Sequence, residues 1–156
     1  MTTYLITPFI DALIDDLQAV LPEISVARVH RYTPRSLERL ERDGDLHLAV
    51  WFSAEQLAEE ALPLATGTRR FLHRYEVLLW QACSEAVDLV ADEDGAREFL
   101  ALVERVREQF LAARVRTLGG AIEVIWRGCE IEAGGGQGST RYARITVEAN
   151  FALDFA

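Results

Sequence analysis

The sequence predicts an α+β fold, with a mixed, mainly antiparallel sheet of about five strands packed against an amphipathic helix and an N-terminal helix. Three observations lead to this expectation. Strand-like apolar runs recur along the chain, and the last, Thr140–Leu153, alternates apolar and polar residues without a break. Ala96–Ala113 repeats apolar residues at helical spacing. The strands are mostly joined as hairpins, which leaves the helices to cover one face of the sheet.

The N-terminal helix is expected from Pro8 to Leu21. Thr7 offers a capping hydroxyl, and Pro8 follows in the first turn, where its missing N–H costs nothing. Pro22 ends the helix. One face carries the apolar residues, which are Ile10, Leu13, Ile14, Leu17, Val20 and Leu21.

Two elements are expected between this helix and the first central strand. Ile24–Tyr32 has the weak alternation of a strand. Thr33 repeats the cap-and-proline pattern and predicts a short, charged surface helix over Pro34–Asp43, with Gly44 as its stop.

The segment Leu46–Phe52 is apolar on both faces apart from His47, which indicates a strand in the middle of a sheet covered on each side. Ser53 with Gln56 three residues on is a capping-box pattern. It predicts a brief helix over Ala54–Ala61.

A long strand is expected over Arg69–Ala82, because its first half alternates and its second half is continuously apolar. Cys83–Ala91 fits either a continued strand or a helical turn. Asp92–Asp94 place negative charge where a helix N-terminus favours it, so the amphipathic helix is expected to begin at Ala96.

The chain closes with a predicted hairpin of Ala121–Glu132 and Thr140–Leu153 around a glycine-rich loop. The terminal strand spans about 46 Å at the usual rise per residue. A one-residue slip would expose its apolar set, so its register is strongly specified. The apolar face carries Ala143, Ile145, Val147, Ala149, Phe151 and Leu153, and the polar face carries Thr140, Tyr142, Arg144, Thr146, Glu148 and Asn150.

Composition narrows the possible functions. The 156 residues, half of them apolar, suit one domain (1–156) that buries a core without disulfides or metal. The net charge of −9 opposes direct binding of DNA or RNA, because nucleic-acid binders concentrate positive charge to neutralise phosphates. Met1–Pro8 lacks the pattern of a secretory signal, and no apolar run approaches the ~20 residues of a membrane span. We expect a soluble protein made in a cytoplasm.

No catalytic or cofactor-binding signature is found. The stretch Gly134–Gly138 has no following lysine and lies between strands, so it does not predict a phosphate loop. Ser139 lacks the flanking glycines of a nucleophile elbow. Cys83 and Cys129 are far apart and are expected to be free thiols. We therefore expect a protein that is not an enzyme and has no cofactor.

The histidines do not predict a metal site. His30, His47 and His73 fall in three different expected strands, and none has a partner at metal-ligand spacing. Convergence of these histidines in the folded chain stays open.

Candidate contact residues lie around the loop before the long strand. Leu57, Leu62 and Leu64 stand among polar residues, and they either tuck under the loop or form the apolar centre of a contact with another chain. The group Arg69, Arg70 and Arg74 can pair with an acidic neighbour, either within the fold or on another subunit. Two long strands with few edge protections favour a homo-oligomer.

The order of elements resembles the tail terminator (tail completion, head–tail joining) proteins of long-tailed phages and related phage-derived particles. The resemblance covers nearly the whole chain and rests on element order and pattern. It is carried by Pro8–Leu21, Phe71–Trp80, Ala96–Ala113, Ile122–Ile131 and Tyr142–Leu153.

The resemblance implies a structural virion protein, assembled in the host cytoplasm and located in the tail. It implies a homohexameric ring that caps the tail tube, stops its growth and meets a neck or head-closure protein, while DNA passes without specific binding. The loops Leu57–Thr68 and Gly134–Ser139 are expected to make the axial contacts. The interface residues expected from these loops and from the start of the long strand are Leu57, Leu62, Leu64, Arg69, Arg70, Gly135 and Gln137.

Two alternatives stay open. Another virion joint, such as a head-closure or neck ring or a tail-assembly component, would share the charge and the oligomeric state. A small α+β ligand-binding protein or enzyme would instead build a site from convergent side chains such as His73, Arg74 and Tyr75.

Overall fold

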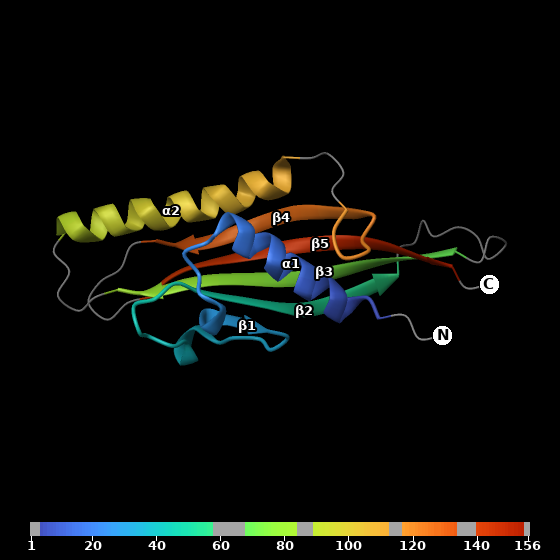
Figure 1. Cartoon of the computed structure of the whole chain (residues 1–156), viewed down its shortest axis with the longest axis horizontal. Helices are drawn as coiled ribbons and strands as arrows, with labels where there is room; N and C mark the ends of the chain where they lie inside the picture. The colour runs from blue at the N-terminus through green and yellow to red at the C-terminus, as the bar shows by residue number, and fades with distance from the viewer. Residues whose placement is uncertain (1–3, 58–67, 84–88, 113–116, 134–139, 155–156) are drawn as a thin grey trace.

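The structure is a computed structural model that describes residues 4–57, 68–83, 89–112, 117–133 and 140–154. Five strands form one sheet in the order β1-β2-β3-β5-β4, in which only the β1–β2 pair is parallel. Two α-helices accompany the sheet, which confirms the α+β class (Figure 1). The elements are α1 (Ile6–Val20), β1 (Val29–Arg31), β2 (His47–Leu57), β3 (Thr68–Ala82), α2 (Leu89–Leu111), β4 (Glu123–Glu132) and β5 (Thr140–Asp154).

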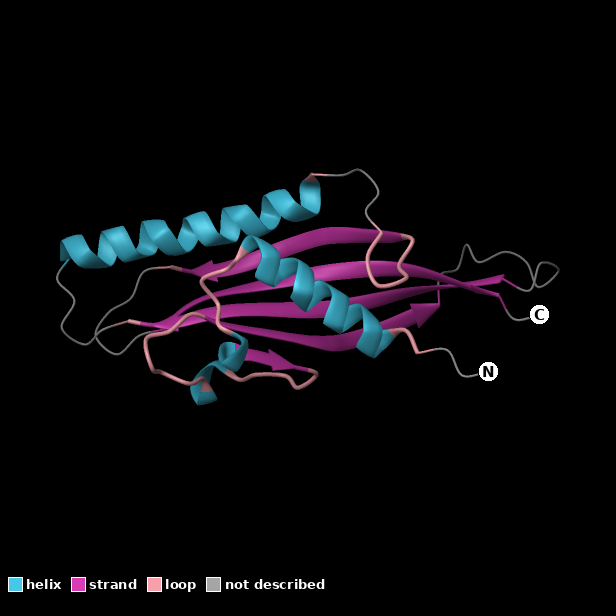
Figure 2. Cartoon of the chain, viewed as in Figure 1, coloured by secondary structure: helices cyan, strands magenta, loops and turns pink. Residues whose placement is uncertain are grey.

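Both α-helices lie on the same face of the sheet, here called the helix face (Figure 2). The apolar set of β5 points into the core between sheet and helices, as the alternation predicts. Phe9 of α1 and Tyr75 of β3 pack against each other there as tilted rings, with ring centroids 4.4 Å apart. The buried residues of β5 on this face are Ala143, Ile145, Val147, Ala149 and Phe151.

The opposite face, here called the back face, is covered over β2 and β3 by the segment 33–46. Leu40 packs there in a small apolar cluster with Trp51 and Trp80. Tyr32 carries the chain from β1 toward this face with φ 73, a left-handed conformation that is uncommon for a residue other than glycine. The central part of β2 is therefore covered on both sides, as its apolar sequence predicts.

Two helices begin earlier than the sequence suggests. Helix α1 starts at Ile6, and Leu5 rather than Thr7 takes the N-cap position, with no side-chain hydrogen bond. Helix α2 starts at Leu89, so Asp92 and Gly95 lie within it. The buried guanidinium of Arg141 explains both residues, since Nη2 bonds Asp92 Oδ1 at 2.7 Å and lies 2.8 Å from where a Cβ of residue 95 would stand.

The expected helix at 54–61 is wrong over its described part. Residues 54–57 continue β2 beyond a bulge at Ser53, because β3 offers strand partners from Arg74 to Phe71. The hydroxyl of Ser53 donates to the carbonyl of Arg74 at 3.1 Å instead of capping a helix. Residues 58–61 lie outside the described chain.

The expected helix at 34–43 is also wrong. Only a 3-10 turn, Leu37–Arg39, forms there. The rest of the segment packs as irregular chain against the back face of the sheet. Side chains of β3 bind its carbonyl groups, since Trp80 donates to Glu41 O and Gln81 to Gly44 O. The expected strand at 24–32 is reduced to a 3-10 turn, Val26–Arg28, and the short β1.

Cys83 is buried and Cys129 is half-buried, and both are free thiols. Burial raises the pKa of the Cys129 thiol to about 11. No helix within the described residues has the length and apolarity needed to cross a membrane.

Candidate functional site

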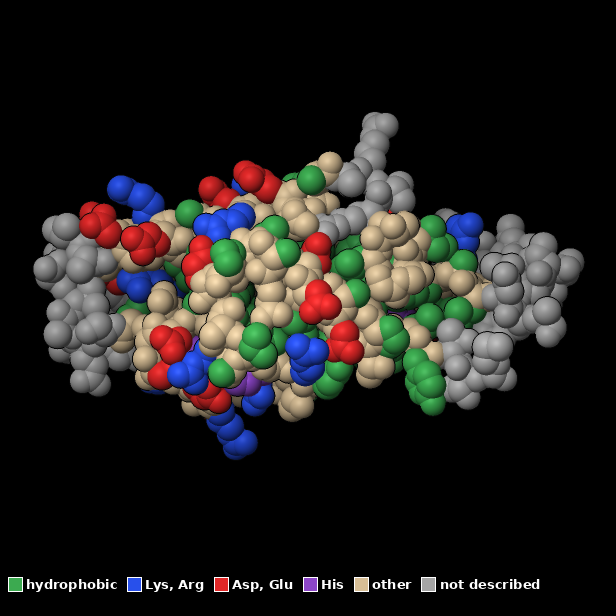
Figure 3. All heavy atoms as spheres, viewed as in Figure 1, with side chains coloured by type: hydrophobic (Ala, Val, Ile, Leu, Met, Phe, Trp, Pro, Cys, Tyr) green, Lys and Arg blue, Asp and Glu red, His purple; other side chains and the backbone are tan. Residues whose placement is uncertain are grey.

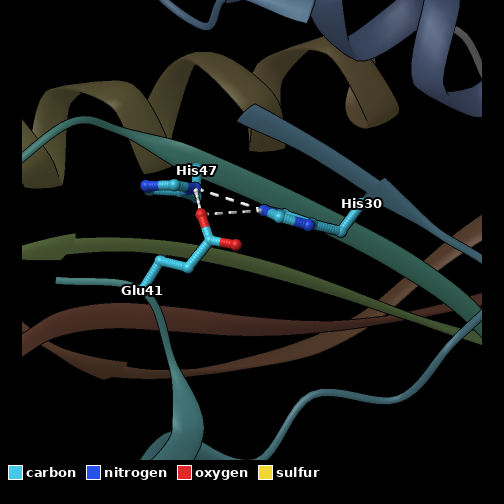
Figure 4. A group of neighbouring side chains, drawn as sticks. All are labelled: His30, Glu41 and His47. Carbon is cyan, nitrogen blue, oxygen red and sulfur yellow. Dashed lines mark hydrogen bonds and ion pairs between the residues drawn. The ribbon is translucent and has the colours of Figure 1, made fainter. Parts of the chain in front are cut away.

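Two of the three histidines meet on the back face. His30 lies in the middle of β1, and His47 is the first residue of β2. In the parallel register His30 stands opposite Ala49, so both rings point to the same side of the sheet. His30 Nε2 lies 3.2 Å from His47 Nδ1, and the Glu41 carboxylate reaches toward both nitrogens (Figure 4).

The indole of Trp80 forms the floor of this cluster. Its ring stacks on His47 at a centroid distance of 4.8 Å and on His30 at 5.2 Å. His47 is fully buried, whereas Glu41 is half exposed. The imidazoles are therefore held in place by packing, while the carboxylate side of the cluster opens to solvent.

A continuous chain of hydrogen bonds fixes the ring protons. Arg35 can only donate, so His30 Nδ1 accepts from its Nη2 at 3.0 Å. The carboxylate of Asp43 can only accept, so His47 Nε2 donates to its Oδ1 at 2.8 Å. The remaining proton, on His30 Nε2, points at His47 Nδ1. Each ring is neutral in this arrangement.

The surrounding residues favour neutral His30 and ionised Asp43. Burial lowers the pKa of His30, and the nearby Arg35 charge adds to that effect. The hydrogen bond from His47 lowers the pKa of Asp43. Arg28 forms ion pairs with Asp43 at 3.0 Å and with Asp45 at 3.1 Å, which anchors the segment that carries Glu41.

The third histidine lies elsewhere, on the helix face. His73 Nε2 donates to Glu55 at 2.7 Å, and Tyr75 donates to His73 Nδ1 at 3.0 Å. Burial, followed by the Glu55 charge, raises the pKa of Tyr75. Arg74 points to the other face of β3 and pairs with Glu148 at 3.3 Å. Of the three residues suggested for a ligand site, His73 and Tyr75 therefore meet on the helix face, while Arg74 lies on the back face.

The groove beside His73 is open and shallow. Its volume is about 340 Å³, and it is lined by Glu55, His73 and the residues of the chain from Tyr4 to Thr7. The lining is mostly apolar, and its carboxylate and imidazole, those of Glu55 and His73, are already joined by a hydrogen bond. This groove offers a surface for contact rather than an enclosed reaction site.

Three of the expected interface residues gather at one end of the sheet. Leu57 ends β2 with half of its surface exposed, and Arg69 and Arg70 stand near the start of β3. Seen from the helix side, apolar side chains are prominent toward this end, whereas charged side chains surround the helices (Figure 3). The remaining four, Leu62, Leu64, Gly135 and Gln137, lie outside the described residues.

Each border of the sheet has a strand edge that is not paired by another strand of the described residues. Within the described residues, β4 pairs with β5 only, which leaves its other edge open. Strand β1 pairs with β2 only at Leu48, Ala49 and Val50, so the outer edge of β2 beyond them has no strand partner in the described chain. Strands β2 and β4 each carry one irregularity in register, β2 at Ser53 and β4 at Arg127.

The part of the back face outside the Trp80 cluster carries joined charges. Glu148 of β5 is buried between Arg74 and Arg127, with the second pair at 3.0 Å. Thr146 donates to Glu76 at 3.1 Å on the same face. This surface is polar and ordered by its own ion pairs.

No protein family model and no curated protein sequence matches this chain. The sequence pattern singled out His30 and His47 separately but gave no reason to include Glu41 or Asp43. Parallel pairing of the strands and the return of the segment 33–46 over the back face bring these residues together.

Proposed function

We propose that this chain is a structural virion protein of a long-tailed phage or phage-like particle, a tail terminator. Copies of the chain form a ring that caps the tail tube and joins it to the neck. The subunit does no catalysis, and it acts by binding its own copies and the proteins above and below it.

The observation that carries the proposal is a pair of strand edges, on opposite borders of one sheet, that no strand of the described residues pairs. A free edge presents unpaired N–H and C=O groups, and a small domain normally protects or pairs them. If β4 of one copy pairs with β2 of the next, the contact is head-to-tail, and such a contact closes into a ring when the rotation permits. The bulges at Ser53 and Arg127 restrict where a neighbouring strand can pair.

The positions of two connections, at opposite ends of the sheet, support the proposed contacts with the tube and the neck. The connection from Leu57 to Thr68 leaves the end where Leu57 pairs with Phe71. The connection from Ala133 to Thr140 leaves the opposite end, where Thr140 pairs with Ala82. A subunit that meets a tube on one side and a neck on the other needs a contact segment at each end.

The charge suits a channel that DNA passes through. Each copy carries a net charge of −9, so a ring multiplies the negative potential around its centre. Nucleic acid is repelled by such a wall and does not adhere during passage. Another virion joint, such as a head-closure or neck ring, shares these features, and the identity of the bound partner separates the two.

The proposal is tested by blocking one edge. Ile122 immediately precedes β4 and Ile131 lies near the end of that strand, and each keeps about two fifths of its surface exposed, 42% and 40%. The double variant Ile122→Lys/Ile131→Lys should fold, lose the ring in negative-stain images and lose binding to the tail-tube protein of the same particle. Leu111→Lys, at an apolar residue of α2 that is 63% exposed, is the matched control and should keep both.

A wild-type chain that stays single and ignores the tube, while its circular dichroism shows an intact fold, overturns the proposal. Rings that bind a head-closure protein but not the tube favour the other virion joint.

A further inference from the structure

We infer that His30, Glu41 and His47 form a binding site for one divalent transition-metal ion of the zinc type. The inference stands on the arrangement of these side chains and does not depend on the proposed ring. The ion would join β1, β2 and the segment 33–46 on the back face.

The geometry of the three ligand atoms matches a metal of this size. His30 Nε2, His47 Nδ1 and Glu41 Oε2 form a triangle with sides of 3.2, 3.6 and 3.9 Å (Figure 4). A point equidistant from the three atoms lies about 2.1 Å from each, which is the usual length of zinc–nitrogen and zinc–oxygen bonds. The spacing of the three atoms is therefore already that of ligands around one ion.

The donor types also fit. Imidazole nitrogens with a carboxylate suit zinc and its neighbours among the divalent transition metals, whereas calcium and magnesium prefer oxygen alone. Glu41 lies at the exposed side of the cluster, with 53% of its side chain accessible. Water can reach the ion from that side and complete a four-coordinate shell.

His47 is already in the form that binds metal. Its Nε2 proton is held by Asp43 at 2.8 Å, which leaves the lone pair of Nδ1 facing the centre of the cluster. A carboxylate on the second nitrogen of a metal-bound histidine is the usual partner that fixes ring orientation and raises ligand basicity. The stack on Trp80 holds the ring from below.

His30 needs one proton shift. Its Nδ1 accepts a hydrogen bond from Arg35 at 3.0 Å, so the proton sits on Nε2, where the metal must bind. Metal binding moves this proton from Nε2 to Nδ1 and displaces Arg35, so no net proton is lost from His30. Arg35 thus competes with the metal, which gives the inference a test that a purely structural hydrogen-bond network would not pass.

The experiment titrates the untagged, metal-free chain with Zn²⁺ by calorimetry and with Co²⁺ by visible absorption. One ion should bind per chain, with affinity falling as acid protonates the imidazoles. A hundredfold excess over Kd should raise Tm by about 5–10 °C. Arg35→Gln, which replaces the competing donor with a side chain that can accept from Nδ1–H, should bind Zn²⁺ more tightly than wild type.

The variants identify the ligands. Asp43→Asn should weaken Zn²⁺ binding by about 10–100-fold, and Glu41→Gln and His30→Gln should weaken it further. Glu38→Gln, an exposed carboxylate of the same segment, is the matched control and should bind as wild type does. Glu41→Gln changes a half-exposed side chain, so its result does not depend on a change of fold.

Absence of saturable one-to-one binding to the wild-type chain overturns the inference. Equal affinity in Glu41→Gln, His30→Gln and Glu38→Gln overturns it as well, because the bound ion would then be held elsewhere on the surface.

Discussion

The two faces of the sheet are built by different rules. On the helix face the odd-numbered residues of β5 from 143 to 151 are apolar and buried beneath α1 and α2. On the back face the same strand carries Arg144, Thr146 and Glu148, whose side chains are paired with polar neighbours or lie beside them. The first face contributes burial of apolar area, which needs only the right pattern. The second depends on particular partners at particular distances.

The largest expected effect comes from placing charge on the helix face. Val147 is fully buried in the middle of β5. Val147→Asp should lower the free energy of unfolding by at least about 4 kcal/mol, because a carboxylate is buried without a partner. Ala152→Asp, at an exposed position of the same strand, should change it little. Similar urea midpoints for the two variants would show that the faces are not distinguished as described.

The one charge that the helix side of β5 already holds provides the second test. Arg141 is buried, and its guanidinium is 2.7 Å from Asp92 of α2. Asp92→Ala should destabilise the fold by about 2 kcal/mol, since a buried cation loses its charged partner. Its exposed neighbour is the control, and Glu93→Ala should lie close to wild type in thermal denaturation.

The free energy of unfolding should depend on pH through His30 on the back face. The pKa of His30 in the folded chain lies below its usual 6.5, chiefly because of burial. As the pH falls, the unfolded chain therefore takes up a proton on His30 before the folded chain does. The stability that neutral His30 contributes is fully present above pH 6.5, and it is lost as the pH falls from 6.5 toward the pKa of His30 in the folded chain. His30→Gln should flatten this part of the stability profile.

A second variant sharpens the pH test. The Glu41 charge favours protonated His30, so Glu41→Gln should lower the pKa of His30 further and deepen the loss of stability in mild acid. Parallel profiles for wild type, His30→Gln and Glu41→Gln in metal-free buffer would contradict the assignment of this dependence to His30.

The smallest effect is expected on the exposed charges of the back face. Arg127 pairs with Glu148 at 3.0 Å, but its side chain is 51% exposed. Arg127→Ala should cost less than about 1 kcal/mol, because water screens such pairs and Arg74 still neutralises Glu148. A loss of stability as large as that of Asp92→Ala would mean that the exposed ion pairs of the back face stabilise the fold as much as the buried ion pair of Arg141 does.

The same contrast explains what could be predicted from the sequence. The long strands β3 and β5 follow from their own residues, because alternation and continuous apolar runs state which side is buried. The segment 34–43 and residues 54–57 could not be predicted, because their local patterns favour helix and distant partners override them. Leu40 and Glu41 are held by Trp80, and residues 54–57 are held by β3.

The candidate site has the same limit. His30 and His47 were visible as isolated residues in strands, but their meeting depends on the parallel register of β1 and β2. Glu41 reaches them because the segment after Tyr32 returns over the back face, where Trp80 binds the carbonyl group of Glu41. No spacing of residues along the sequence predicts that these side chains meet. Neither the three candidate ligands nor Asp43 therefore forms a recognisable sequence motif.

The central claim is that one subunit leaves strand edges which further copies complete. Native mass spectrometry of the untagged wild-type chain tests it most directly, because the mass counts the copies without reference to any partner. The account predicts one dominant closed assembly of several copies that persists on dilution. A folded chain found only at its own mass of 17.5 kDa would contradict it.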